Sequence, residues 1–252
     1  MVGMTILFKI FIITSFVFGQ SGLEIARMVD NRKTPKDLSN VAKMILTNSK
    51  GKTRINKMAS RSMDGNKKQI IWFLEPKDDK GVAFLKIEHN NKDDEMRMWL
   101  PAFNKVRRIS SKKKGDSFMG SDLSYEDMSN RNIDEYTFNR LDDVLIDGKT
   151  CYVIETIPDS KSRSSYSKHI TWIDKKSLMF VKEESFDRRG NLKKEKEFSF
   201  LELTGYFVMN RIYVKDVQKK HSTEVTFDRL EVDTGISSNL FQEKNLKRLP
   251  NF

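Results

Sequence analysis

The chain has 252 residues, of which 38% are hydrophobic and 32% are charged, and its formal net charge is +11. Its single cysteine excludes a disulfide framework within the chain and a Cys-rich metal site. The length suits one large β domain or two small domains. The excess of Lys and Arg favours anionic partners, including an anionic membrane surface. These residues are spread along the sequence, which argues against a nucleic-acid partner.

The first nineteen residues have the pattern of a secretory signal peptide. Lys9 precedes the apolar run IFIITSFVF, residues 10–18, and Val17 and Gly19 occupy the third and first positions before the expected cut. The run is too short to cross a hydrocarbon core of about 30 Å as a helix, although a retained anchor is the alternative. We therefore expect residues 1–19 to direct export and the mature chain, from Gln20, to be periplasmic.

The next segment has a helical pattern. Thr34-Pro35-Lys36-Asp37 has the features of a helix start, with a capping Thr, a Pro at the first position and an early acidic residue. Apolar residues then recur at helical spacing, namely Leu38, Val41, Ala42, Ile45 and Leu46. We expect this helix to pack against a sheet. A shorter helix is a second candidate, at Leu23–Val29.

After Asn48 the pattern changes to strands separated by short turns. Turn signals include Asp64-Gly65-Asn66, Ile146-Asp147-Gly148-Lys149 and Arg189-Gly190-Asn191. Because strand follows strand with short connections, the sheet should be antiparallel. A change of phase between Phe227 and Leu230 predicts a bulge near Asp228. The expected strands cover residues 53–63, 69–75, 83–88, 95–100, 105–109, 136–143, 150–157, 168–174, 179–186, 194–203, 206–215 and 222–233.

Residue types that could support catalysis are present, but no motif organises them. The sequence has no Walker loop, dinucleotide-binding glycine pattern or nucleophile elbow, and its three histidines are far apart. We therefore expect no enzyme, no cofactor and no metal site. Asp122, Glu126 and Asp127 could supply acid/base chemistry or a cation site, but caps and loop hydrogen bonds fit them better. Cys151 lies in the apolar stretch CYVIET and is expected to be a small buried side chain.

One stretch, Met96 to Met128, carries more information than the rest. Met96, Met98 and Leu100 share one face of an extended chain, and Arg97 and Trp99 share the other. A lysine cluster follows at residues 112–114, and then an apolar, glycine-containing, acidic segment at residues 118–128. The chain as a whole has 17 Phe and 12 Met residues, which is typical of an ordinary core or of a flexible apolar binding cavity.

The sequence of this stretch, WLPAFNKVRRI followed by FMGSDLSYEDM, resembles that of an exported bacterial family of outer-membrane lipoprotein-sorting proteins. That family is a longer branch of the LolA/LolB-like superfamily. The resemblance implies one mainly β domain over residues 20–252. It has an N-terminal helix, a single curved antiparallel sheet that forms an incomplete barrel, and a helical cover.

The resemblance also implies a periplasmic carrier. Such a protein binds the acyl chains of a lipoprotein or lipid and moves it between inner-membrane machinery and the outer membrane. The alternative is a non-enzymatic sensor or accessory module of the same fold that partners an RND-type exporter.

A carrier needs a dry cavity, because burying each CH₂ is worth about 0.8 kcal/mol and a chain of about fifteen is worth roughly 12 kcal/mol. The alternative is that the same side chains form a closed core. The candidate lining residues are aromatic, Met or Leu: Trp72, Phe84, Met98, Trp99, Leu100, Phe118, Met119 and Met128.

Overall fold

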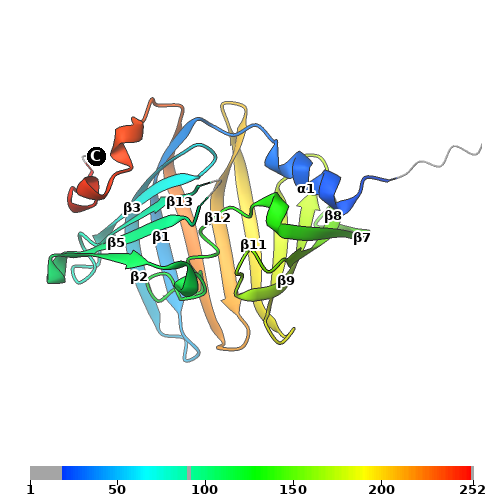
Figure 1. Cartoon of the computed structure of the whole chain (residues 1–252), viewed down its shortest axis with the longest axis horizontal. Coiled ribbons are helices and arrows are strands. Elements are labelled where there is room, and N and C mark those ends of the chain that lie inside the picture. The colour runs from blue at the N-terminus through cyan, green and yellow to red at the C-terminus, as the bar shows by residue number, and fades with distance from the viewer. Residues whose placement is uncertain (1–18, 90–91, 251–252) are drawn as a thin grey trace, which may run out of the picture.

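The structure is a computed structural model that describes residues 19–89 and 92–250; nearly all of the expected signal peptide, residues 1–18, lies outside the described residues. Within the described part, thirteen strands form one antiparallel sheet in the order β6-β5-β4-β3-β2-β1-β13-β12-β11-β10-β9-β8-β7 (Figure 1). The edge strands β6 and β7 are consecutive in the sequence and are not paired with each other there, so the sheet does not close into a barrel. The connection between them, residues 110–135, therefore has to cross from one edge to the other.

The elements have the following bounds. The helix α1 spans Gly22–Asp30. The strands are β1 Asp37–Thr47, β2 Thr53–Met63, β3 Lys68–Glu75, β4 Ala83–Ile87, β5 Glu95–Leu100, β6 Lys105–Ile109, β7 Tyr136–Ile146, β8 Lys149–Pro158, β9 Tyr166–Asp174, β10 Phe180–Asp187, β11 Leu192–Leu203, β12 Tyr206–Asp216 and β13 His221–Val232. All twelve expected strands are confirmed, with ends within three residues.

The helix expected after Thr34 is wrong, because Asp37–Thr47 is the central strand β1. β1 pairs along its length with β2 on one side and β13 on the other. Its inward phase is Ala42, Met44 and Leu46, which pack in one apolar cluster. The helical spacing of its apolar residues is a weak preference, and the strand hydrogen bonds to β2 and β13 override it.

The short helix expected at Leu23–Val29 is confirmed as α1. Ser21 and Glu24 form a capping box, in which each side chain accepts a hydrogen bond from the other residue's backbone N–H. Ile25 and Val29, four residues apart, are buried against side chains of β8 and β9. Figure 1 shows α1 beside β7 and β8, so part of the expected helical cover comes from this short helix.

The two faces of the sheet carry separate apolar cores. We call the face crossed by residues 110–135 the inner face, and the opposite one the outer face. The inner core comprises Ala42, Met44, Met58, Ile71, Phe73, Val82, Phe84, Met96, Met98, Ile109, Phe118, Leu123, Tyr125, Ile212, Val214 and Val225. The outer core comprises Ala59, Ile70, Trp72, Ala83, Leu85, Trp99, Phe241 and Leu246. Phe241 and Leu246 belong to the C-terminal segment after β13, which covers the outer face near β3 and β5 (Figure 1).

Three local expectations are confirmed. Val41 lies opposite Asp228 while Ser39 lies opposite Glu231, so β13 carries an extra residue, and Arg229 within it has a positive φ of 49°. Cys151 is buried. The Asp147-Gly148 pair turns the chain from β7 to β8. Both residues have a positive φ, 49° at Asp147 and 77° at Gly148, and the glycine adopts this conformation without strain. Over the described ranges, no helix has the length and apolar character needed to span a membrane.

Candidate functional site

The inner core is completed by a segment without regular structure, Ser117–Arg131, which we call the cover segment. Its pairing within the described residues is one isolated bridge between Ser117 and Ser124. Phe118 is 2% exposed, and its ring lies 5.2 Å from that of Phe84 and 6.0 Å from that of Phe73. The cover segment is therefore packed on the sheet through side chains and is not hydrogen-bonded to it as a strand.

The eight residues expected to line a cavity divide between the two faces. Phe84, Met98 and Phe118 belong to the inner core, and Leu100, Met119 and Met128 pack against it. Trp72 and Trp99 lie in the outer core instead. Met98 and Trp99 are neighbours in β5, and successive side chains of a strand point to opposite faces, so they cannot line one cavity.

On the outer face, Trp99 is shielded by the C-terminal segment. Phe241 and Leu246 pack in the same cluster, and the Lys247 ammonium lies 4.7 Å from the centre of the Trp99 indole ring. Arg97, on the same face, binds Glu243 at 2.5 Å. The C-terminal segment therefore shields Trp99, and the site on the inner face is left with six of the eight expected residues.

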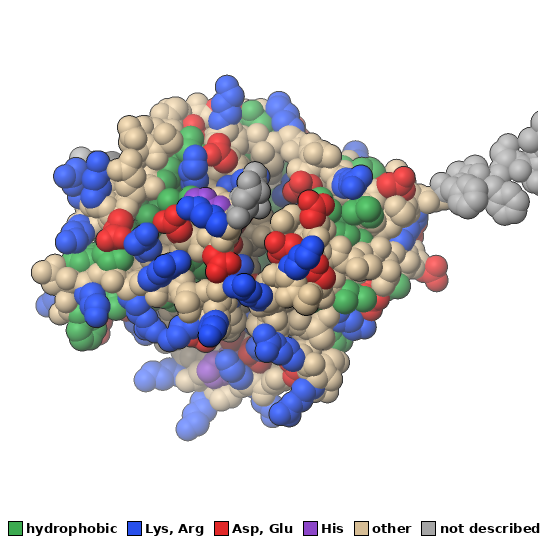
Figure 2. All heavy atoms as spheres, viewed as in Figure 1, with side chains coloured by type: hydrophobic (Ala, Val, Ile, Leu, Met, Phe, Trp, Pro, Cys, Tyr) green, Lys and Arg blue, Asp and Glu red, His purple; other side chains and the backbone are tan. Residues whose placement is uncertain are grey.

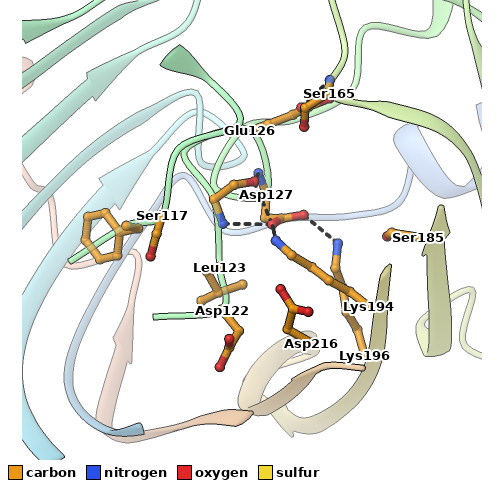
Figure 3. A network of polar contacts seen from close by, with 12 residues as sticks. Ser117, Asp122, Leu123, Glu126, Asp127, Ser165, Ser185, Lys194, Lys196 and Asp216 are labelled. Atoms are coloured by element: carbon orange, nitrogen blue, oxygen red, sulfur yellow. Dashed lines mark hydrogen bonds and ion pairs between the residues drawn. The ribbon is translucent and has the colours of Figure 1, made fainter. Parts of the chain in front are cut away.

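A buried ionic cluster occupies the rest of the inner face, on β9, β10 and β11. Asp127 of the cover segment binds the Nζ atoms of Lys194 at 2.7 Å and Lys196 at 2.6 Å. All three side chains are at most 5% exposed. Figure 3 shows the Asp127 carboxylate pointing at the ends of both lysine side chains, which rise together from β11. The cover segment is thus held to the sheet by ion pairs as well as by apolar contacts.

Glu183 of β10 is the second carboxylate of this cluster. It accepts two parallel hydrogen bonds from the Arg131 guanidinium, at 2.7 and 2.8 Å, and one from Lys196 at 2.9 Å. Thr171 donates to it at 3.0 Å. His169 lies beside the cluster, with Nδ1 at 2.8 Å from the Ser185 hydroxyl. Arg131 is the last residue of the cover segment, so this contact ties its end to the sheet.

The electrostatics of the cluster favour the charged form of both carboxylates. Burial by itself would raise the pKa of Asp127, but the ammonium groups of Lys196 and Lys194 outweigh it and hold that pKa well below its usual range. Burial likewise opposes ionisation of Glu183, and Arg131 and Lys196 hold its pKa well below normal. Burial and the nearby Arg131 charge depress the pKa of His169, which is therefore neutral near pH 7. Removing one partner from such a buried ion pair leaves the other charge uncompensated, which destabilises the folded protein.

A second anchor lies on β4, at the other end of the inner face. Lys86 is fully buried and donates to the Glu88 carboxylate at 2.6 Å and to the Met128 backbone carbonyl at 2.7 Å. Glu88 in turn accepts from the backbone N–H of Asn130 at 2.9 Å. Both halves of the inner face therefore hold the end of the cover segment.

The acidic group of the cover segment was expected to make caps and loop hydrogen bonds. This is confirmed for two members: Asp122 accepts from the Thr223 hydroxyl at 2.8 Å, and Glu126 accepts from Ser165. Asp127 also accepts from Ser124 at 2.8 Å, but its two lysine partners were not foreseen. The described residues hold no group of three or more His, Cys, Asp or Glu side chains placed to bind a metal ion.

Lys194, Lys196 and Glu183 were missed because charged residues in a strand suggest a solvated face. One signal was available in the sequence of β11. Lys194 and Lys196 have the same phase as Phe198, which packs against the inner core, so all three had to share a face. Their partners could not be identified, since Asp127 is 67 residues away from Lys194.

Two depressions lie in the surface of the described residues, and both are small. One of about 260 Å³ is lined by charged residues including Glu95, Arg97 and Arg108. A second of about 180 Å³ lies at the margin of the inner core, beside Leu46 and Asp122. Pockets for organic ligands are typically about 300–1,000 Å³. Phe118, Leu123 and Tyr125 of the cover segment fill the inner face beside β3 and β4.

Comparison with solved structures first defines the class of protein. A LolA superfamily protein from Nitrosomonas europaea has a TM-score of 0.71 over 90% of this chain and 99% of its own, at 17% identity. That level of identity speaks to fold alone. The chain therefore has the LolA-like fold: mainly β, with one N-terminal helix and a single open antiparallel sheet.

Closer relatives define the family. A domain from Vibrio parahaemolyticus, described as an outer membrane lipoprotein-sorting protein, is 34% identical, with a TM-score of 0.85 over 90% of this chain and 98% of its own. A DUF1329 family protein from Desulfovibrio piger is 29% identical, with a TM-score of 0.84 over 89% of this chain and 97% of its own. A family model described as an uncharacterized protein matches residues 65–248. No curated protein sequence matches. The chain belongs to the outer-membrane lipoprotein-sorting protein family, and it has the LolA-like fold.

Proposed function

We propose that this protein is a non-enzymatic periplasmic carrier that binds the acyl chains of a lipoprotein or lipid on the inner face of its sheet. It would move that cargo between inner-membrane machinery and the outer membrane. The observation that carries the proposal is the cover segment. Its apolar side chains fill the inner face, yet no strand ladder binds it to the sheet. It can therefore leave while the thirteen strands stay paired.

The energetics favour exchange of one apolar occupant for another. Removing Phe118, Leu123 and Tyr125 from the inner core would expose the side chains of β3 and β4 that they cover. An acyl chain of about fifteen CH₂ groups, worth roughly 12 kcal/mol when buried, would cover the same surface. The exposed cover segment, tethered at β6 and β7, stays available to refill the site on release.

The same filled face also favours a second function. A LolA-like domain whose inner face is permanently closed would act as a sensor or accessory module, with an RND-type exporter as the partner. On the face of this protein that Figure 2 shows, basic side chains are interspersed with acidic ones, so no single charged patch marks a partner surface there. The two functions differ in whether the cover segment opens, which can be measured.

A reversible crosslink across the cover tests the carrier directly. The Thr223 hydroxyl lies 2.8 Å from both the backbone N–H and the carboxylate of Asp122, which suits replacement of the pair by cysteines. Asp122→Cys with Thr223→Cys, in a Cys151→Ala background, should bind a dansyl-labelled fatty acid when reduced and lose binding when oxidised. The two single-cysteine variants should bind under both conditions.

Two outcomes would reject the carrier. Wild-type protein that takes up no fatty acid in detergent-free buffer would leave the sensor or accessory module as the function. Equal binding by the oxidised and reduced crosslink variants would show that lipid binds elsewhere than beneath the cover. Localisation has its own test: N-terminal sequencing of protein from the periplasm should begin near Gln20.

A further inference from the structure

We infer that Lys194 and Lys196 form a head-group site for an anionic amphiphile, and that Asp127 of the cover segment occupies this site in the closed state. The inference rests on the carrier function proposed above and specifies the class of its ligand. The ligand would have one negatively charged group, a carboxylate or a phosphate, joined to an apolar chain.

The cover segment itself has the layout of such a ligand. Phe118 and Leu123 lie in the inner core, while Asp127, a few residues further on, lies between the two lysines. Figure 3 shows Leu123 and Asp127 of the cover segment, with the Asp127 carboxylate at the ends of the two lysine side chains. An amphiphile that replaced the cover segment would place its chain in the apolar part and its charge in the ionic part.

One strand, β11, carries residues of both the ionic and the apolar part of the inner face. Lys194, Lys196 and Phe198 share the inward phase of β11, and Phe198 packs against the inner core. At about 3.3 Å per residue, Lys196 lies roughly 7 Å along the strand from Phe198. That spacing lets a charged head group contact the lysines while the attached chain enters the apolar part.

Charge balance shows which group loses its partner on opening. Asp127 and Arg131 both belong to the cover segment and leave with it, whereas Glu183 remains on the sheet and keeps its 2.9 Å contact with Lys196. In the described ranges, Asp127 is the one carboxylate in ion-pair contact with Lys194. Opening therefore leaves the Lys194 ammonium without its ion-pair partner, while Lys196 keeps Glu183.

Asp216 of β12 does not take the place of Asp127 as the ion-pair partner of Lys194. Asp216 lies opposite Lys194 in the β11–β12 register. Its carboxylate accepts instead from the backbone N–H groups of Gln218, at 3.1 Å, and Lys219, at 2.9 Å. A buried ammonium without a partner is strongly unfavourable, so the open site favours a ligand that carries a negative charge over an uncharged one.

Matched ligands test the inference. Dodecyl phosphate, dodecanoate and dodecanol share one chain and differ in head group. Wild-type protein should bind either anion about tenfold or more tightly than the alcohol. Lys194→Met should reduce that preference to within about twofold, with dodecanol binding retained. Lys215→Gln also removes one positive charge, from an exposed side chain, and should leave the preference unchanged.

Further variants separate folding from recognition. Lys194→Met combined with Asp127→Asn removes one charge of each sign from the buried cluster, and it too should lose the anion preference. Asp127→Asn alone should strengthen binding of the anions more than of the alcohol, because the competing carboxylate is gone.

The outcomes are distinguishable. A wild-type protein that binds all three ligands equally overturns the head-group site while the carrier stands. Failure to bind any of them rejects the carrier itself. Inorganic phosphate that raises the melting temperature in a Lys194-dependent way, without any acyl chain, would make this a site for free anions and overturn the amphiphile assignment.

Discussion

Lys86 of β4 and Met128 of the cover segment are joined by a hydrogen bond of 2.7 Å, from Nζ to the backbone carbonyl oxygen. The lysine is fully buried, and burial lowers its pKa although Glu88 opposes the shift. A buried ammonium is thus the link between the apolar half of the sheet and the end of the cover segment. A substitution at Lys86 therefore tests how firmly this end of the cover segment is held to the sheet.

Replacing this link should loosen the cover segment and destabilise the fold. Lys86→Met leaves the Glu88 carboxylate without its ammonium partner, which should cost about 3 kcal/mol in the free energy of unfolding. Urea denaturation measures the loss, and amide hydrogen exchange should accelerate at Met128 and Asn130. Lys68→Met, which breaks the more exposed ion pair with Asp64, should change stability by less than about 1 kcal/mol. Equal effects of the two variants would contradict a special role for Lys86.

Truncating the central ring of the cover should have two opposite effects. Phe118→Ala removes contacts with Phe73, Phe84 and Tyr125 and should destabilise the protein by about 3–5 kcal/mol. It should also strengthen binding of a fluorescent fatty acid, because the competing side chain is gone. Phe103→Ala, at a side chain that is 76% exposed, should change neither quantity. Destabilisation without any gain in fatty-acid binding would identify the inner core as a permanently closed one.

The buried cluster should make stability depend on pH. Burial and Arg131 lower the folded-state pKa of His169, so the unfolded chain binds the proton first as the pH falls through about 6.5. Stability should therefore decrease on acidification, with a slope of up to about 1.4 kcal/mol per pH unit from this group. The pKa values of Asp127 and Glu183 are also lowered against the effect of burial, so their contribution is present above the unfolded pKa, near 4, and is lost below it.

Urea denaturation at a series of pH values separates these groups. His169→Gln should flatten the dependence between about pH 6.5 and pH 5, and leave the steep loss at lower pH. Parallel curves for the variant and the wild type would show that His169 does not contribute to the pH dependence.

The exit from β13 should control the environment of Trp99. Asp37 accepts hydrogen bonds from the backbone N–H groups of Thr234, Gly235 and Ile236, where the C-terminal segment begins. Burial would raise the pKa of Asp37, but these bonds outweigh it and lower that pKa. Asp37→Ala should destabilise the protein by about 1–3 kcal/mol and release the segment that covers Trp99.

Fluorescence can report this release. With Trp72 and Trp172 replaced by Phe, the emission of Trp99 should shift to longer wavelength in Asp37→Ala and stay unchanged in Asp78→Ala, where the aspartate is exposed. Because Trp99 is on the outer face, a fatty acid should leave its emission unchanged in either background. A strong response to fatty acid would place the ligand on the outer face and contradict the inner site.

The sequence by itself determined most of the strands, their antiparallel order and the short helix α1. These follow from local patterns: alternation of apolar residues, turn residues such as Asp147-Gly148, and the Ser21–Glu24 capping box. Alternation also separated Met98 from Trp99 onto opposite faces of one strand. The expected cavity lining nevertheless included both residues, because a list of apolar residues does not record the face of the sheet to which each side chain points.

Only the tertiary structure decided what lies on each face. Asp37–Thr47 is a strand because its two edges pair with β2, the next strand in the sequence, and with the distant β13. No local pattern contains the pairing with β13. The meeting of Asp127 with Lys194 and Lys196 has the same origin. A carboxylate and two lysines remain charged in a dry interior only when the fold brings them together, so the pairing depends on the path of the chain from β6 to β7.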